Sequence, residues 1–213
     1  MTDSTPAVTG AETLREDVDR RVWRLQRAYL NPSDRENSDV TAALAHLRRC
    51  APDAVGADPS VWAVTLADLP DQLRSKRKDD EPSPAEAAVH AALVLYATHQ
   101  QSNQTPIHMR GVSLGDAVRR LAEARAHNGE PDESSIRRLH QVVLANDAAG
   151  RLHYLRGLIT LLRSESDPIP LDYAQLAVDL WRLLDPKQDS ERVVARWGRD
   201  LHNRPRATTG ESE

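Results

Sequence analysis

The feature that most constrains this chain is a succession of short segments in which apolar residues recur at helical spacing. The segment 110–121 is the clearest example. Ser113 can cap a helix, and Asp116, three residues later, has the position of the acid in a capping box. The apolar residues that follow are spaced i, i+3, i+4 and i+7, which leaves Arg119 and Arg120 on the outer side of the helix or at its border. The segment therefore predicts a capped helix with a basic outer face.

Similar patterns predict helices along the rest of the chain, and no stretch alternates Val, Ile and Thr in the manner typical of strands. The chain lacks Phe and has only four Trp and four Tyr, so Leu, Val and Ala must fill the core. The expected helices cover about residues 11–29, 38–49, 59–73, 83–99, 113–126, 132–144, 148–164, 171–184 and 190–203. We therefore expect an all-α fold.

The polar segment 100–106 interrupts this pattern and is the predicted domain boundary. We expect two small helical bundles packed together, an N-terminal bundle over residues 11–103 and a C-terminal bundle over residues 104–205. A chain of 213 residues is long enough for each bundle to bury a core. Small polar residues at 1–10 and 206–213 predict disordered tails.

Charge is unevenly distributed along the chain. The formal net charge is -4, and residues 1–73 carry 8 basic and 12 acidic side chains, so the remaining residues are balanced at 20 of each. Of the 28 basic residues, 25 are Arg, which suits bidentate contacts with phosphate. A general codon preference for arginine explains that number equally well. The placement of the arginines is therefore more informative than their number.

Several classes of protein are excluded by simple features. Cys50 is the only cysteine, which rules out an intrachain disulfide and a cysteine-rich zinc site and fits a reducing cytoplasm. The first ten residues lack the basic start and apolar run of a secretory signal. No apolar run approaches the roughly 20 residues needed to span a bilayer. We expect a cytoplasmic protein that makes no membrane contact.

The residue types of metal and catalytic sites occur here without the spacing that such sites need. His90 and His99 lie on opposite sides of one expected helix, so they cannot share a metal, and His99 is expected to be packed and hydrogen-bonded. Asp172 and Asp179 share a helix face, but Asp172 lies in a first turn, where an acid complements the helix dipole. No phosphate-binding loop, nucleophile elbow or dinucleotide-binding turn is present. We expect no metal, no cofactor and no enzymatic activity.

Arginines fall at helical spacing beside the apolar stripes of the C-terminal half. Arg156 and Arg163 are seven residues apart on one flank of the helix 148–164. Arg137 and Arg138 lie on the outer or lateral side of the preceding helix. A third row, in the last helix, consists of Arg192, Arg196 and Arg199. These three faces predict a surface that follows a phosphate backbone.

Two interpretations of these rows remain open. The first is the phosphate-binding surface, and the second is a set of solvated faces joined by salt bridges, with Arg196 and Asp200 as an obvious i, i+4 pair. No aromatic platform for base stacking lies among these arginines. Contacts with nucleic acid are therefore expected to involve mainly the backbone.

Six short motifs follow one another in a fixed order. They are YATHQQ at 96–101, GVSLG at 111–115, IRRL at 136–139, LRGL at 155–158, IPLDYAQLA at 169–177 and RWGRDL at 196–201. In order and spacing this set resembles the CasB family, the small subunit of the type I-E Cascade CRISPR surveillance complex. The resemblance covers residues 85–202 well and the first 80 residues in outline.

The resemblance implies a non-enzymatic, all-helical protein that sits as a pair within Cascade. Its implied protein partners are the backbone and large subunits of the complex. Its implied nucleic-acid partners are the target DNA, the displaced strand and the guide RNA. Base pairing with the guide reads the sequence, so the subunit needs only phosphate contacts to stabilise the R-loop. The alternatives are a helical scaffold module that binds only protein partners, and a hydrolase or nuclease with metal-dependent turnover.

Eight arginines are the candidate nucleic-acid contacts. The resemblance assigns five of them by position, Arg48, Arg49, Arg137, Arg138 and Arg156. Helical geometry adds Arg119, Arg120 and Arg163. Asp116 occupies a position that is basic in some relatives, so we expect weaker binding beside it. The acidic balance of residues 1–73 predicts an interruption of the basic surface.

Overall fold

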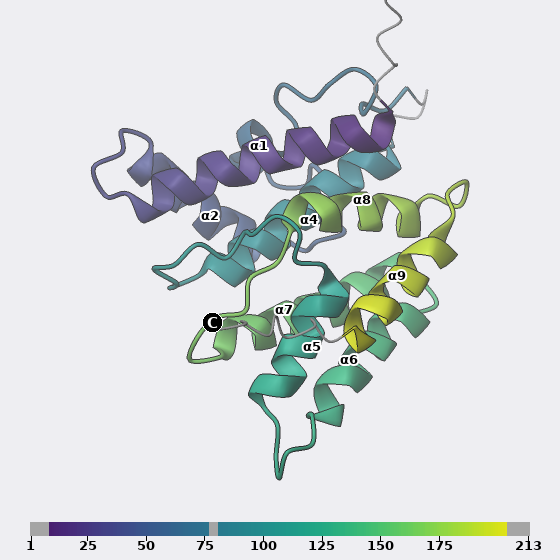
Figure 1. Ribbon diagram of the computed structural model, residues 1–213. Helices are drawn as coiled ribbons and strands as arrows, with labels where there is room; N and C mark the ends of the chain where they lie inside the picture. The colour runs from purple at the N-terminus through teal and green to yellow at the C-terminus, as the bar shows by residue number, and fades with distance from the viewer. Residues whose placement is uncertain (1–8, 77–80, 204–213) are drawn as a thin grey trace, which may run out of the picture.

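The computed structural model describes residues 9–76 and 81–203, and within these ranges it contains nine α-helices, one short 3-10 helix and no β-strand (Figure 1). The helices are α1 (Gly10–Leu30), α2 (Asn37–Arg49), η1 (Pro59–Val61), α3 (Trp62–Thr65), α4 (Pro84–Gln100), α5 (Leu114–Ala124), α6 (Glu133–Leu144), α7 (Ala148–Ser164), α8 (Tyr173–Leu184) and α9 (Ser190–His202). The all-α prediction is confirmed. The helix predicted over 59–73 is shorter, since turns follow α3. The predicted tails lie outside the described residues, except that Thr9 caps α1 and Gly10 begins it.

Helices begin close to where the sequence predicts because local side chains satisfy their first N–H groups. Ser83 and Glu86 form a complete capping box at α4, in which each side chain accepts from the other residue's N–H, at 3.0 and 2.7 Å. Ser113 caps α5 by accepting from the N–H of Asp116 at 3.2 Å. The capping box predicted there does not form, because the Asp116 carboxylate pairs with two arginines of its own helix.

Helix α4 is the centre of the fold. Residues 88–100 are all buried, because α1, α2, α7 and α8 surround the helix. The buried surface therefore extends around the helix and is not confined to one face. Both His90 and His99 are therefore buried, although they point to different sides of α4.

The helices form two groups, which Figure 1 shows as an upper and a lower layer. Helices α1, α2, α4 and α8 pack together in one, and α5, α6, α7 and α9 in the other, with α4 against α7 between them. The predicted boundary near residue 103 assigns α8 to the C-terminal bundle, whereas the structure packs it on α1 and α4. Most of α8 is apolar and buried, which favours a central place. The division into domains at residues 103 and 104 stays a prediction.

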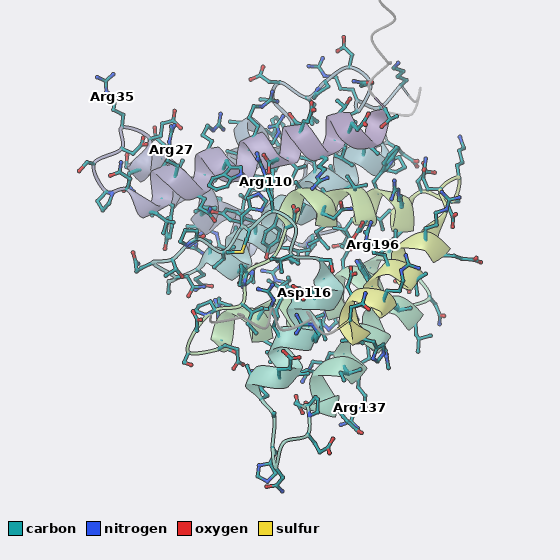
Figure 2. All side chains as sticks on the ribbon, in the orientation of Figure 1. Arg27, Arg35, Arg110, Asp116, Arg137 and Arg196 are labelled. Carbon is teal, nitrogen blue, oxygen red and sulfur yellow. The ribbon has the colours of Figure 1, made fainter. Side chains whose placement is uncertain are left out.

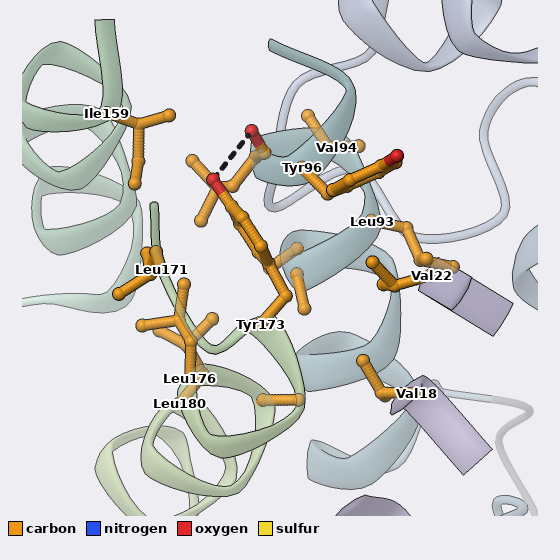
Figure 3. Close-up of a cluster of buried hydrophobic side chains, with 14 of the residues drawn as sticks. Val18, Val22, Leu93, Val94, Tyr96, Ile159, Leu171, Tyr173, Leu176 and Leu180 are labelled. Atoms are coloured by element: carbon orange, nitrogen blue, oxygen red, sulfur yellow. Dashed lines mark hydrogen bonds between the residues drawn. The ribbon is translucent and has the colours of Figure 1, made fainter. Parts of the chain in front are cut away.

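The core is continuous between the two groups, and Tyr173 lies where they meet (Figure 3). Its ring packs edge-to-face on Tyr96, with centroids 5.4 Å apart. Its hydroxyl forms a hydrogen bond of 2.8 Å with Nδ1 of His99. The prediction of a packed, hydrogen-bonded His99 is confirmed. Burial lowers the pKa of His99 to about 3, so the ring is neutral near pH 7.

Candidate nucleic-acid interface

Arg156 joins α7 to the end of α2. Its Nη1 donates to the carbonyl oxygen of Cys50 at 2.7 Å, and its Nη2 donates to the carbonyl oxygen of Arg48. The last carbonyls of a helix have no partner within the helix, and the helix dipole attracts a cation to them. Arg48 and Arg49 therefore lie beside Arg156, although 106 residues separate Arg156 from Cys50 in the chain.

Arg163 continues this basic strip about 10 Å further along α7, two helical turns from Arg156. It donates from Nη1 to Oε1 of Gln101 at 2.6 Å. We call Arg48, Arg49, Arg156 and Arg163 the α2–α7 seam. Within the described part of the chain, no carboxylate forms an ion pair with any of these four arginines. The seam therefore carries positive charge without a direct ion pair, although the Asp58 carboxylate interacts electrostatically with Arg49.

Arg137 and Arg138 project from α6 as a second basic group. Both side chains are exposed, and Figure 2 shows Arg137 extending from the lower layer. Arg137 lies 3.8 Å from Glu133, an exposed pair of the kind that contributes little. Arg138 forms no ion pair with a described residue. No hydrogen bond or ion pair among the described residues joins this group to the seam.

Arg119 is more buried than a basic outer face would require. Its side chain is only 10% exposed, and its guanidinium pairs with Asp116 and, at 2.8 Å, with Glu123. Arg120 is 41% exposed and also pairs with Asp116, at 2.8 Å. Of the predicted outer side or border, Arg119 lies at the border of the apolar stripe, where α9 packs closely on α5 and covers it. The Asp116 carboxylate therefore partly neutralises the positive charge of both arginines.

The arginines of α9 are also partly engaged. Arg196 pairs with the buried Asp179 of α8 and not with Asp200, so that predicted pair is wrong. The indole N–H of Trp197 donates to the same Asp179 carboxylate at 2.8 Å. Asp200 instead accepts from the hydroxyl of Ser113 at 2.6 Å. Burial raises the pKa of Asp179, although these donors favour its charged form. This network ties α8 to α9.

A family model described as CRISPR-associated protein Cse2 matches residues 43–202. This chain belongs to the Cse2 family. The crystal structure of CasB from Thermobifida fusca is 38% identical and has a TM-score of 0.68, covering 90% of this chain and 98% of that one. A Cse2-family protein from Thermus thermophilus is 23% identical with a TM-score of 0.57, covering 86% of this chain and 96% of that one, and supports the fold alone. Among curated proteins, none matches.

The family assignment confirms the resemblance that the motifs indicate, and two of those motifs now have a structural explanation. In IPLDYAQLA, Asp172 caps α8 by accepting from the N–H of Gln175 at 2.9 Å, and it also accepts from the N–H of Gly111 at 2.9 Å. In GVSLG, Gly115 allows close approach to α9, because a β-carbon there would lie 2.2 Å from the carbonyl oxygen of Trp197. These residues hold the Cse2 fold together.

Over residues 9–76 and 81–203, no three His, Cys, Asp or Glu side chains come together in a group suited to a metal ion. In the same ranges, no helix combines the length and the apolar character needed to cross a bilayer.

Helix α1 carries a row of arginines that is absent from the predicted contacts. Arg20, Arg24 and Arg27 are spaced i, i+4 and i+7 on the exposed side of this helix, with Trp23 between them. Arg110, from the loop before α5, reaches the same side (Figure 2). The helical spacing of the three arginines is visible in the sequence. The net negative charge of residues 1–73 hides it when the segment is judged as a whole.

Proposed function

We propose that this Cse2-family protein is the non-catalytic small subunit of a type I-E Cascade complex in the cytoplasm. In this role it stabilises the R-loop through sequence-independent contacts with the phosphates of the target strand and the displaced strand. Its partners are the backbone and large subunits that carry the guide RNA, the guide RNA itself, and a second copy of the same subunit. It uses no metal and no cofactor.

The observation that carries this proposal is the α2–α7 seam. Two chain segments far apart in sequence contribute arginines to one strip. No carboxylate among the described residues forms an ion pair with these arginines. The guanidinium group presents several N–H donors in a planar fork that matches phosphate oxygens. Because the guide RNA reads the sequence, contacts with the backbone are sufficient for the subunit.

The arginines have different roles in this proposal. Arg49, Arg138 and Arg163 are exposed or half-exposed and contact phosphate directly, as do Arg48 and Arg137. Arg156 is a positioning residue, because its guanidinium is occupied by carbonyls at the end of α2. Arg120 contributes weakly beside Asp116, and the buried Arg119 is removed from the contact set.

A scaffold module that binds only protein partners is the second candidate. Leu144 is 75% exposed at the end of α6, and Tyr154 is exposed on the neighbouring α7. Exposed apolar side chains on adjacent helices are typical of surfaces that contact other proteins. The scaffold hypothesis differs from the proposal in one respect, since it predicts no binding to free nucleic acid.

Fluorescence anisotropy with labelled DNA at low salt separates the two candidates. The ligands are a duplex and an R-loop mimic, both of a sequence unrelated to any guide. We expect saturable binding of both, competed equally by unlabelled DNA of any sequence. Titration without saturable binding would contradict the proposal and favour the scaffold. Incubation of the protein with the same DNA and Mg²⁺ or Mn²⁺ tests the hydrolase or nuclease alternative. We expect the DNA to remain uncut.

A further inference from the structure

Trp23 is an aromatic side chain held in place on the surface of α1 while 43% of it remains exposed. The guanidinium carbon of Arg110 lies 5.9 Å from the centre of its ring. Asp19 fixes this arginine by accepting from its Nε at 2.9 Å. The ring of His108 lies nearly perpendicular to the indole, with ring centroids 5.7 Å apart. The indole is therefore ordered before any ligand arrives.

A groove surrounds this indole. Its lining includes Trp23, the arginines on the neighbouring turns of α1, Arg110, and the apolar side chains of Leu30 and Pro106. Its volume is about 760 Å³, within the roughly 300–1,000 Å³ of sites that hold small organic ligands. The groove thus combines an aromatic surface with several cations.

Asp19, which also lines the groove, pairs with Arg110, whereas the other carboxylates of this region leave the arginines of α1 available. Asp17 is buried and is already paired with Arg21 through a hydrogen bond of 2.6 Å, so Arg20, which also contacts it, keeps positive charge. Among the described residues, Arg24 pairs with the exposed Glu36 at 4.0 Å and Arg27 pairs with the largely covered Asp34 at 3.6 Å, and both distances are long for an ion pair. Long ion pairs at the surface contribute little. A ligand with phosphate groups therefore finds cations available in the groove.

We propose that the Trp23 groove, formed by Trp23, Arg20, Arg24, Arg27 and Arg110, binds single-stranded DNA. One base stacks on the exposed part of the indole, and Arg20, Arg24 and Arg27 contact the flanking phosphates, while Asp19 holds Arg110 over the ring. Sequence-independent sites for single strands combine these two elements, since every base has a face that can stack. Bases within a duplex already stack on one another, so the groove selects an unpaired strand. The inference rests on the proposed function, in which the displaced strand of the R-loop is the unpaired DNA.

The test compares Trp23→Ala with Trp62→Ala as a matched control. Trp62 is 47% exposed on α3, but within the described residues no arginine stacks on it. The ligands are a labelled oligothymidylate and an abasic strand of the same length, which has phosphates and no bases. Stacking contributes about 1–3 kcal/mol per base, so W23A should bind oligothymidylate about 5- to 150-fold more weakly than wild type. W62A should bind it like wild type, and Trp23→Tyr should keep most of the affinity.

The abasic strand isolates stacking from charge, because W23A and wild type should bind it equally. Equal binding of oligothymidylate by W23A and W62A would overturn the inference. It would also be overturned if W23A lost affinity equally for oligothymidylate and for the abasic strand. Thermal melting of W23A and W23Y checks the fold of each variant. A Trp23-dependent preference for oligouridylate would overturn the assignment to DNA. Wild-type protein that binds no strand contradicts the proposed function itself, whereas normal binding by W23A contradicts only the Trp23 groove.

Discussion

The guanidinium of Arg156 on α7 lies 2.7 Å from the carbonyl oxygen of Cys50 and caps the end of α2. This hydrogen bond links the two groups of helices at the place where the seam forms. It also gives Arg156 a structural role that its sequence position does not reveal. Loss of DNA binding in an Arg156 variant would therefore not by itself identify a phosphate contact.

Arg156→Ala should destabilise the protein by about 1.5–3 kcal/mol, the typical value for hydrogen bonds to a charged group. Arg156→Lys should recover part of the loss, because an ammonium supplies charge without the fork that reaches two carbonyls. Arg163→Ala is the control and should cost less than about 0.5 kcal/mol, since Arg163 makes one exposed contact with a side chain. Urea unfolding measures all three. Equal stabilities of the two alanine variants would contradict the capping role.

Gly115→Ala should destabilise the protein strongly. A β-carbon at this position would lie 2.2 Å from the carbonyl oxygen of Trp197, and a backbone atom cannot move aside as a flexible side chain can. We expect the free energy of unfolding to fall by at least about 1–3 kcal/mol. Gly157→Ala in α7 meets no atom within 4 Å and should instead stabilise by about 0.5–1 kcal/mol through helix propensity. A higher melting temperature for G115A would contradict the close crossing of α5 and α9.

Arg119 and Arg138 should respond in opposite ways to the same substitution. Arg119→Gln breaks a largely buried ion pair network, so it should lower the free energy of unfolding and leave the salt dependence of DNA binding unchanged. Arg138→Gln removes an exposed charge, so stability should stay within about 0.5 kcal/mol of wild type while DNA binding weakens. Unfolding and anisotropy titrations on both variants test this. Unchanged stability with weaker DNA binding for R119Q, together with lower stability and unchanged DNA binding for R138Q, would contradict the assigned roles.

The buried His99 should make the protein sensitive to acid. Burial lowers its folded-state pKa to about 3 from the ordinary 6.5, so between these values the unfolded chain binds a proton that the folded chain does not. The stability from this group is complete above about pH 6.5 and falls by up to roughly 1.4 kcal/mol per pH unit below it. His99→Gln should show a shallower loss of stability between about pH 7 and pH 5. Identical slopes for variant and wild type would contradict the burial effect.

The sequence predicts the helices well because their signals are local. Ser83 and Glu86 define the start of α4 with a complete capping box, and the predicted limits of α7 agree with those of the structure. The short segment around Trp62 is less well predicted, because a turn with little periodicity gives a weak signal. Local signals also identify the motifs on which the family resemblance depends.

The candidate site is less predictable, because charge neutralisation depends on tertiary contacts. Nothing near Arg196 in the sequence indicates that Asp179, 17 residues away, replaces Asp200 as its partner. Arg156 likewise caps a helix that lies more than 100 residues earlier. Helical spacing gives the side of a helix on which an arginine lies, whereas the packing of neighbouring helices decides whether that side is exposed.

The salt dependence of duplex-DNA binding tests the central claim most directly. One variant replaces with Gln the exposed seam and α6 arginines Arg49, Arg137 and Arg138. The control has the same net charge and replaces with Gln Arg35, Arg74 and Arg182, which are exposed or half-exposed and have no assigned contact with nucleic acid. Removing one phosphate-binding arginine lowers the slope of log Kobs against log salt by about 0.9, so the slope of the first variant should fall by up to about 2.7 while the control keeps the wild-type slope. Equal slopes for the two variants would contradict the assignment of phosphate contacts to these arginines.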